Sequence, residues 1–188
     1  ISIYFRIHTD QTVNRRFLDA KNARTNAILS IDDDILINPN DLEFGFRIWK
    51  KHSNQIVGYN KRFIKKVDED GKEKLKYSYW GSKARLIITG VAFLSRDLCL
   101  AYYGQNEGEC LKLGQKMNNC EDILMNFIAV KLYNLPGVYV NRSYKHLKSR
   151  GISTSQKKHI FARSLCLNEF KKSFKKLPFI ITNESMFN

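Results

Sequence analysis

The chain has 188 residues and a formal net charge of +14, and 43% of its residues are hydrophobic and 12% aromatic. This composition excludes a disordered chain and predicts a single domain, residues 1–188, with its own hydrophobic core. No apolar run is long enough for a membrane-spanning helix. The basic excess fits either a solvated surface or an anionic partner, and no zinc-finger, basic heptad or ribonucleoprotein motif supports nucleic acid.

Strands and helices are expected to alternate, which predicts an α/β fold with a mixed sheet. In the N-terminal half we expect strands at Ser2–His8, Ala27–Ile31 and Gln55–Tyr59, a loop with a short helix at Gln11–Lys21, a helix from Pro39 to about Lys51, and a hairpin over Phe63–Tyr79. Asn38 can cap the helix that Pro39 begins. An Asp-Gly pair ending at Gly71 supplies the turn of the hairpin.

In the C-terminal half one strand is expected at Ala84–Leu94, where Gly90 suggests a close approach by a ligand or a second backbone. The remaining expected elements are helices at Arg96–Tyr103, Cys120–Tyr133 and His159–Phe174, a strand at Val138–Val140, a polar loop at Arg142–Lys158, and an irregular tail beyond Pro178.

Three consecutive carboxylates, Asp32, Asp33 and Asp34, follow the apolar run Ala27–Ile31 directly. Such a run is typical of a buried parallel strand, and open α/β sheets bind ligands at the carboxyl ends of their strands. Three adjacent acids repel one another, and magnesium or manganese would relieve that repulsion. An acidic turn before the helix at Pro39 explains the same residues without a metal.

Other candidate site residues lie at helix starts or in basic pairs. Asn119, Glu121 and Asp122 open the helix at 120–133, where acids also complement the helix dipole. Arg16 follows another arginine and invites a phosphate, although a surface charge is the simpler interpretation. Arg163 is interpreted from its position alone as a solvated helix residue.

Four cysteines, Cys99, Cys110, Cys120 and Cys166, stand at spacings that do not fit a zinc site. Their even number permits disulfides, but buried thiols are equally compatible with it. Two glycosylation sequons weakly favour a secretory compartment. The first six residues lack the order of a signal peptide, and since the chain begins without Met we expect an internal or trimmed segment.

Several segments in their order resemble one family. They are Asn14–Leu18, Thr25–Asp34, Asp41–Trp49, Gln55–Gly58, Thr89–Phe93, Asn119–Phe127 and Arg163–Asn168. Together they resemble glycosyltransferase family 64, the C-terminal transferase domain of the exostosins and exostosin-like proteins. That domain begins with one or two further strands, so the resemblance implies an N-terminally truncated GT-A type fold.

The resemblance also implies roles for the charged residues. In the family pattern Asp34 and Asp32 hold Mn²⁺ or Mg²⁺, and Asp32 and Asp33 contact the ribose, the metal or the donor sugar. Asp122 matches the catalytic carboxylate and Arg163 the catalytic arginine.

Three more positions match residues that contact the donor, namely Arg16, Asn119 and Glu121. Many relatives carry Asp where this chain has Glu121. If Asp122 and Arg163 face one donor sugar, their helices must converge. Because relatives also carry both cysteines, we expect a Cys120–Cys166 disulfide.

The leading hypothesis is therefore a metal-dependent, retaining transferase. It would move an N-acetylhexosamine, most simply GlcNAc, from a UDP-sugar to a glucuronate-containing glycan of the heparan sulfate type. An inositol phosphoceramide glycolipid is the alternative acceptor, and a non-catalytic glycan-binding protein is the alternative of another class. The enzyme hypothesis implies the lumen of the endoplasmic reticulum or Golgi, with membrane association only through segments outside this chain.

Overall fold

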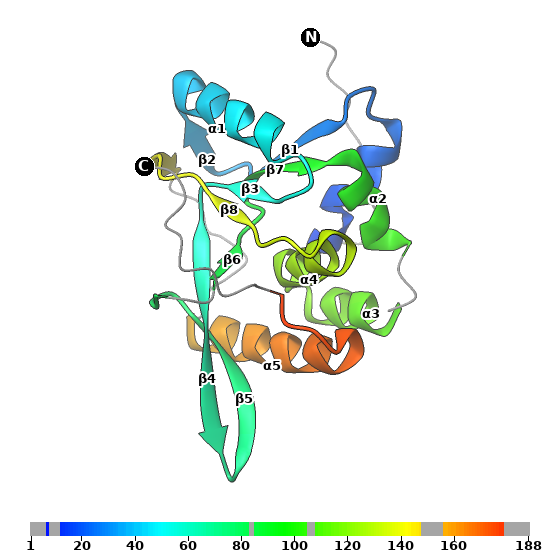
Figure 1. Cartoon of the computed structure of the whole chain (residues 1–188), viewed down its shortest axis with the longest axis vertical. Helices are drawn as coiled ribbons and strands as arrows, with labels where there is room; N and C mark the ends of the chain where they lie inside the picture. The colour runs from blue at the N-terminus through cyan, green and yellow to red at the C-terminus, as the bar shows by residue number, and fades with distance from the viewer. Residues whose placement is uncertain (1–6, 8–11, 83–84, 105–107, 148–155, 179–188) are drawn as a thin grey trace.

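The computed structural model describes residue 7 and residues 12–82, 85–104, 108–147 and 156–178, which form a mixed α/β fold (Figure 1). The helices are η1 (Val13–Asn22), α1 (Pro39–Lys51), α2 (Arg96–Tyr103), α3 (Gly108–Met117), α4 (Glu121–Tyr133) and α5 (Gln156–Phe174). The strands are β1 (Ala27–Ile31), β2 (Ile35–Ile37), β3 (Val57–Gly58), β4 (Lys61–Glu69), β5 (Lys72–Ser78), β6 (Arg85–Ile87), β7 (Val91–Ser95), β8 (Val138–Tyr139) and β9 (Tyr144–His146). The strand expected at Ser2–His8 lies almost entirely outside the described residues.

The largest described sheet has the strand order β1-β7-β3-β8 and is mixed, with β3 and β8 parallel and the other pairs antiparallel. Ala27–Ile31 was predicted to be a parallel strand, and this prediction is wrong, since β1 pairs antiparallel with β7, its described neighbour. The strand is apolar for a different reason. Ile28 packs on one apolar cluster, whereas Ala27 and Leu29 pack on the other, so both faces of β1 are covered.

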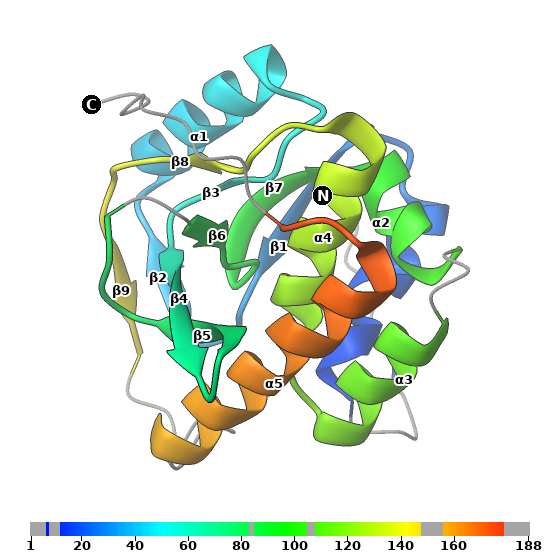
Figure 2. The same cartoon turned by 60° about the horizontal axis from the view of Figure 1, so that its bottom comes forward.

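Helices cover this sheet from both sides (Figures 1 and 2). Trp49 of α1 packs with Val57 and Phe93 in the cluster on one side of the sheet. On the other side α4 runs through the main core, and each of its first ten residues is buried. That complete burial explains why the sequence of α4 shows little amphipathic pattern.

The strand predicted at Ala84–Leu94 is two strands in two sheets. β6 pairs with β4 in the antiparallel sheet β5-β4-β6, and β7 belongs to the sheet of β1. The break between them falls at Ile88–Gly90. A continuous apolar run does not reveal such a break, because both strands are buried.

The predicted polar loop at Arg142–Lys158 contains the three-residue strand β9, which pairs antiparallel with β2, and α5 begins at Gln156 instead of His159. Neither β2 nor β9 was expected, and neither was α3. Strands of three residues carry too little periodicity to be recognised before their pairing partner is known.

The predicted hairpin is present as β4 and β5, and it extends beyond the rest of the described chain (Figure 1). Its turn residues Asp70 and Gly71 both have positive φ, at 56° and 73°, as a two-residue hairpin turn requires. β5 is an edge strand, and α5 lies beside it with α3 on the other side of the helix (Figure 2). The Ser164 hydroxyl accepts a hydrogen bond from Tyr77 N at 3.0 Å, which ties α5 to β5.

Candidate active site

Five of the predicted site residues form one connected group of charges. Arg16 on η1 makes an ion pair with Asp32, which follows β1. The other end of the same guanidinium lies 3.7 Å from the Glu121 carboxylate, measured from Nη1 to Oε1. Asp122 is the next residue of α4 and pairs with Arg163 of α5. The fold therefore unites residues from η1, the end of β1, α4 and α5.

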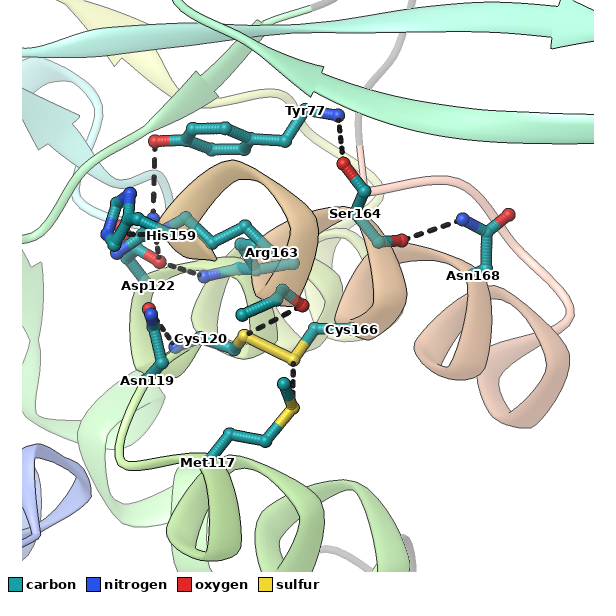
Figure 3. Close-up of a disulfide and its surroundings, with 12 residues drawn as sticks. Tyr77, Met117, Asn119, Cys120, Asp122, His159, Arg163, Ser164, Cys166 and Asn168 are labelled. Atoms are coloured by element: carbon teal, nitrogen blue, oxygen red, sulfur yellow. Dashed lines mark hydrogen bonds and ion pairs between the residues drawn. A yellow bond between two sulfur atoms is a disulfide. The ribbon is translucent and has the colours of Figure 1, made fainter. Parts of the chain in front are cut away.

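Asp122 and Arg163 form the buried end of this group (Figure 3). Arg163 Nη1 donates to both carboxylate oxygens of Asp122, at 2.8 Å and 2.6 Å, and Ile123 N donates to Oδ1 at 2.7 Å. Asp122 is fully buried and Arg163 is 6% exposed. Burial lowers the pKa of Arg163, but the interactions with Asp122, Tyr77 and Glu121 together outweigh it, so the net direction is upward and the guanidinium stays charged.

Two further side chains orient the Arg163 guanidinium. Nε donates to His159 Nε2 at 2.9 Å, Nη1 lies 3.3 Å from the Tyr77 hydroxyl, and the guanidinium carbon lies 5.1 Å from the centre of the Tyr77 ring. Because His159 Nε2 accepts this bond, the neutral ring carries its proton on Nδ1. Burial, followed by the Arg163 charge, lowers the pKa of His159 to about 4.

The remaining terminal nitrogen of Arg163, Nη2, makes no hydrogen bond to any residue that the structure describes. A guanidinium has five N–H donors in a planar fork, and the two on Nη2 therefore remain available to a ligand. The contacts to Asp122, His159 and Tyr77 fix the plane in which those donors lie.

The two carboxylate oxygens of Glu121 differ in their contacts. Oε1 faces Arg16, whereas Oε2 is buried and has no hydrogen-bond partner in the described chain. Burial, and then the neighbouring Asp122 charge, raise the pKa of Glu121. A buried carboxylate oxygen without a partner is costly, so Oε2 is suited to accept a hydrogen bond from a ligand hydroxyl.

Gly90 marks a close approach, as its position in the sequence suggested. A Cβ atom at residue 90 would lie 2.5 Å from Asp32 Oδ2, and Asp32 N donates to the Gly90 carbonyl at 2.7 Å. The neighbouring Thr89 hydroxyl is buried, with no partner among the described atoms. Only glycine leaves room for the Asp32 carboxylate in this position.

Within the described residues, no contact joins Asp33 or Asn119 to the connected group. Asp33 is exposed, whereas Asp34 is half-buried, and its carboxylate lies 3.9 Å from His146 Nδ1. The Asn119 side chain accepts a hydrogen bond from Cys120 N at 2.8 Å, so it orders the start of α4. The described part of the chain holds no group of three His, Cys, Asp or Glu side chains placed to bind a metal.

The predicted disulfide between Cys120 and Cys166 is confirmed, with a Cα–Cα distance of 6.4 Å (Figure 3). It joins the N-cap of α4 to α5, three residues beyond Arg163. Cys120 has a left-handed backbone with φ of 70°, which is uncommon for a residue other than glycine. Cys99 and Cys110, whose state the sequence left open, are buried thiols.

Sequence reasoning missed three members of the site, His159, Tyr77 and Arg62. His159 precedes Arg163 by four residues, and this helical spacing was the one available signal. Arg62 lies 4.6 Å from the centre of the Tyr79 ring, and its buried Nε has no partner in the described chain. Burial raises the pKa of Tyr77 and lowers that of His159, and the Arg62 charge opposes the first shift and adds to the second, so Arg62 acts on the same site. In a chain with so many basic residues, nothing in the sequence singles out Arg62 as a member of the site.

The sequence of the chain is similar to known proteins along almost its whole length. The profile described as "Glycosyl transferase family 64 domain" matches residues 1–187. Exostosin-1 of Drosophila melanogaster is 31% identical over 93% of the chain and 23% of its own length. Glucosamine inositolphosphorylceramide transferase 1 of Oryza sativa subsp. indica is 31% identical over 95% of the chain and 25% of its own length.

A further relative is Glycosylinositol phosphorylceramide mannosyl transferase 1 of Arabidopsis thaliana, which is 28% identical over 97% of the chain and 56% of its own length. The chain thus spans between a quarter and about half of these relatives. Among the residues that the structure describes, no helix is both long enough and apolar enough to cross a bilayer. Because the family profile matches almost the whole chain, the chain belongs to glycosyltransferase family 64.

Proposed function

We propose that the chain catalyses a metal-dependent transfer of an N-acetylhexosamine from a UDP-sugar, with retention of the anomeric configuration, on a GT-A type fold. The observation that supports this proposal most directly is the buried Asp122–Arg163 pair, which Glu121 and Arg16 connect to Asp32. Solvent-excluded charges of fixed geometry are what stabilisation of a charged transition state requires.

Arg163 is proposed to stabilise the departing diphosphate. Its charge is permanent, its plane is held by His159 and Tyr77, and Nη2 keeps donors for phosphate oxygens. A retaining transfer depends more on leaving-group stabilisation than on a strong base. This role needs no movement of the guanidinium away from Asp122.

Asp122 and Glu121 are proposed to face the donor sugar. The Asp122 carboxylate would stabilise positive charge that develops on the sugar as the leaving group departs. Glu121 Oε2 would accept a hydrogen bond from a sugar hydroxyl or amide, which would remove its unpartnered state. Arg16 holds Glu121 and Asp32 at the same side of the site.

Asp34 and Asp32 are the residues that would hold Mn²⁺ or Mg²⁺. Magnesium sites often use one or two carboxylates together with substrate phosphates, so two side chains suffice when a diphosphate supplies the other ligands. The hard oxygen donors of both aspartates fit this role, and Asp33 would contact the ribose or the metal. The metal would supply charge neutralisation of the diphosphate.

The acceptor is proposed to be a glucuronate-containing glycan of the heparan sulfate type. A glycolipid acceptor is the second candidate, because two of the relatives bear names of inositol phosphorylceramide transferases. One of those names specifies a mannosyl transferase, which makes the sugar of the donor part of the test. Either acceptor is anionic and suits a chain of net charge +14. Either would place the protein in the lumen of the endoplasmic reticulum or Golgi.

The test is a titration of the chain with UDP in the presence and absence of Mn²⁺, followed by assays with UDP-GlcNAc, UDP-GalNAc and GDP-mannose on both acceptor types. We expect binding of UDP that requires the metal, and a product whose anomeric proton coupling equals that of the donor. Failure of the folded chain to bind UDP in the presence of Mn²⁺ would contradict the proposal, whatever other anions the chain binds.

A further inference from the structure

A groove of about 990 Å³ lies between β5 and α5, outside the site described above. Its walls include six lysines, namely Lys72, Lys74, Lys76, Lys171, Lys172 and Lys175. Three glutamates, Glu69, Glu73 and Glu169, also line it, so the lining has a positive excess of three charges. The apolar part of the lining includes Phe161, which is 72% exposed, and Leu165.

The groove faces away from the proposed transfer site. Along α5, Arg163 is two residues from both Phe161 and Leu165, which is about 200° around a helix. Along β5, Tyr77 is buried against Arg163, and neither of these two residues is part of the lining of the groove. A ligand in the groove would therefore not compete with one beside Arg163.

The glutamates hold several lysines in place without neutralising the groove. Glu69 bridges the ammonium groups of Lys74 and Lys76 at 2.7 and 2.8 Å, and so leaves a net positive charge. Glu73 pairs with Lys171 of the groove at 2.8 Å and with Lys66 outside it at 3.0 Å, and Glu169 pairs with Lys172 at 2.7 Å. The positive excess of the lining therefore comes from the group around Glu69 and from two further lysines.

Two other lysines of the groove are not compensated in this way. Lys72, near the tip of the hairpin, and Lys175, just beyond α5, make no ion pair within the described ranges. They lie in the same lining although 103 residues separate them in the chain. Both remain available to an anionic ligand.

We propose that this groove binds an anionic polysaccharide chain at a position separate from the transfer site. Spaced ammonium groups suit a ligand whose negative charges repeat along its length, and the exposed Phe161 ring offers an apolar face to sugar rings. A flat membrane surface would be met by basic and apolar side chains on a projecting surface, whereas these line a concavity. The inference does not require the transfer reaction to be the proposed one.

The test measures binding of a heparin oligosaccharide of defined length to the whole chain by calorimetry at about 0.15 M salt. The variant Lys72→Glu/Lys175→Glu is expected to weaken binding about tenfold. Its matched control is Lys51→Glu/Lys112→Glu, which makes the same change of charge at exposed positions of α1 and α3. We expect the control to weaken binding less than about twofold. Phe161→Ser should weaken binding without lowering the melting temperature, because the ring is exposed.

Equal losses in the two double variants would overturn the proposal, since binding would then follow net charge alone. Binding of phosphatidylserine vesicles without binding of heparin would also overturn it, in favour of a membrane surface. Separate UDP titrations distinguish this inference from the proposed function. If the wild-type chain fails to bind UDP but the groove variant still loses heparin affinity, the transferase proposal fails and the groove inference stands.

Discussion

Asn126 of α4 and Asn168 of α5 bind the backbones of two different strands in the same way. Asn126 Oδ1 accepts from Ile87 N at 3.1 Å, and its Nδ2 donates to the Ile87 carbonyl at 2.8 Å. Asn168 makes the equivalent pair with Leu75, at 3.0 and 2.8 Å. Each amide thus occupies the place that a neighbouring strand would take beside that residue.

The same two amides also hydrogen-bond to the helix turns that carry the charged residues of the site. Asn126 donates to the Asp122 carbonyl and Asn168 to the Ser164 carbonyl, each at 2.7 Å. Ser164 follows Arg163 directly. Each helix is therefore docked to its strand within about one turn of a charged residue of the site, which positions Asp122 and Arg163 relative to each other.

Replacing Asn168 by Ala should destabilise the fold, because it leaves the Leu75 N–H and carbonyl without these partners. We expect a loss of about 2 kcal/mol in the free energy of unfolding. Urea denaturation measures it, and Ser173→Ala at an exposed position of the same helix is the control. Faster hydrogen exchange at the Leu75 amide should accompany the loss, and an unchanged urea midpoint would refute this account.

Asp122→Asn and Arg163→Ala should each reduce turnover more than donor binding, since their proposed roles lie in the transition state. We expect turnover to fall at least about 100-fold while the UDP dissociation constant changes by less than about fivefold. Removal of one partner from a buried ion pair can also cost about 3–5 kcal/mol of stability, so the melting temperature must be measured alongside. Arg24→Ala at an exposed site is the control. Near-normal turnover in a folded variant would remove that residue from the mechanism.

Asp34→Ala should abolish metal-dependent UDP binding and leave the fold intact, because the residue is at a turn before β2 and not in the core. Calorimetric titration of UDP with and without Mn²⁺ measures the effect. Asp97→Ala, which removes an exposed acid in the first turn of α2, provides the comparison. An unchanged metal requirement in Asp34→Ala would refute the assignment of this ligand.

Removing the disulfide with Cys120→Ala/Cys166→Ala should lower the free energy of unfolding by about 3–4 kcal/mol on the chain-entropy argument. Turnover should also fall, because the bond links the helices that carry Asp122 and Arg163. Thermal unfolding with and without a phosphine reductant is the measurement. The wild-type chain should respond to the reductant and the double variant should not, and two equal responses would contradict the role of the bond.

The free energy of unfolding should decrease as the pH falls from about 6.5 to about 4, because His159 is protonated more readily in the unfolded chain. Its pKa is lowered from 6.5 to about 4 in the folded chain, so within this window the unfolded chain binds the proton and the folded chain does not. His159→Gln should reduce the slope of stability against pH in this interval, which urea midpoints at successive pH values would show. His52→Gln is the control, and an identical slope in wild type and His159→Gln would contradict the contribution of this histidine.

Elements with strong local signals were predictable from sequence. The start of α1 follows from Asn38, whose side chain accepts from Asn40 N at 2.9 Å, and from Pro39. The hairpin follows from the turn at Gly71. By contrast, the pairing of β2 with β9 joins segments 111 residues apart at Ile35 and His146, and no local pattern contains that information.

The site was predictable only where the family pattern supplied it. From position alone Arg163 was interpreted as a solvated residue, yet it is buried against Asp122. The charge that compensates it lies 41 residues earlier in the chain, so its burial depends on the tertiary packing of α4 against α5. The metal role of Asp34 stays a prediction.

The docking of α5 along β5 also bears on how molecules of this protein meet one another. An edge strand with free N–H and carbonyl groups is a template for pairing with a strand of another molecule, and this is a common route to aggregation. Asn168 occupies both groups at Leu75 and Ser164 occupies the N–H of Tyr77, and charged lysines flank these residues on β5. The long hairpin can therefore project into solvent without offering this part of its outer edge for intermolecular β-sheet growth.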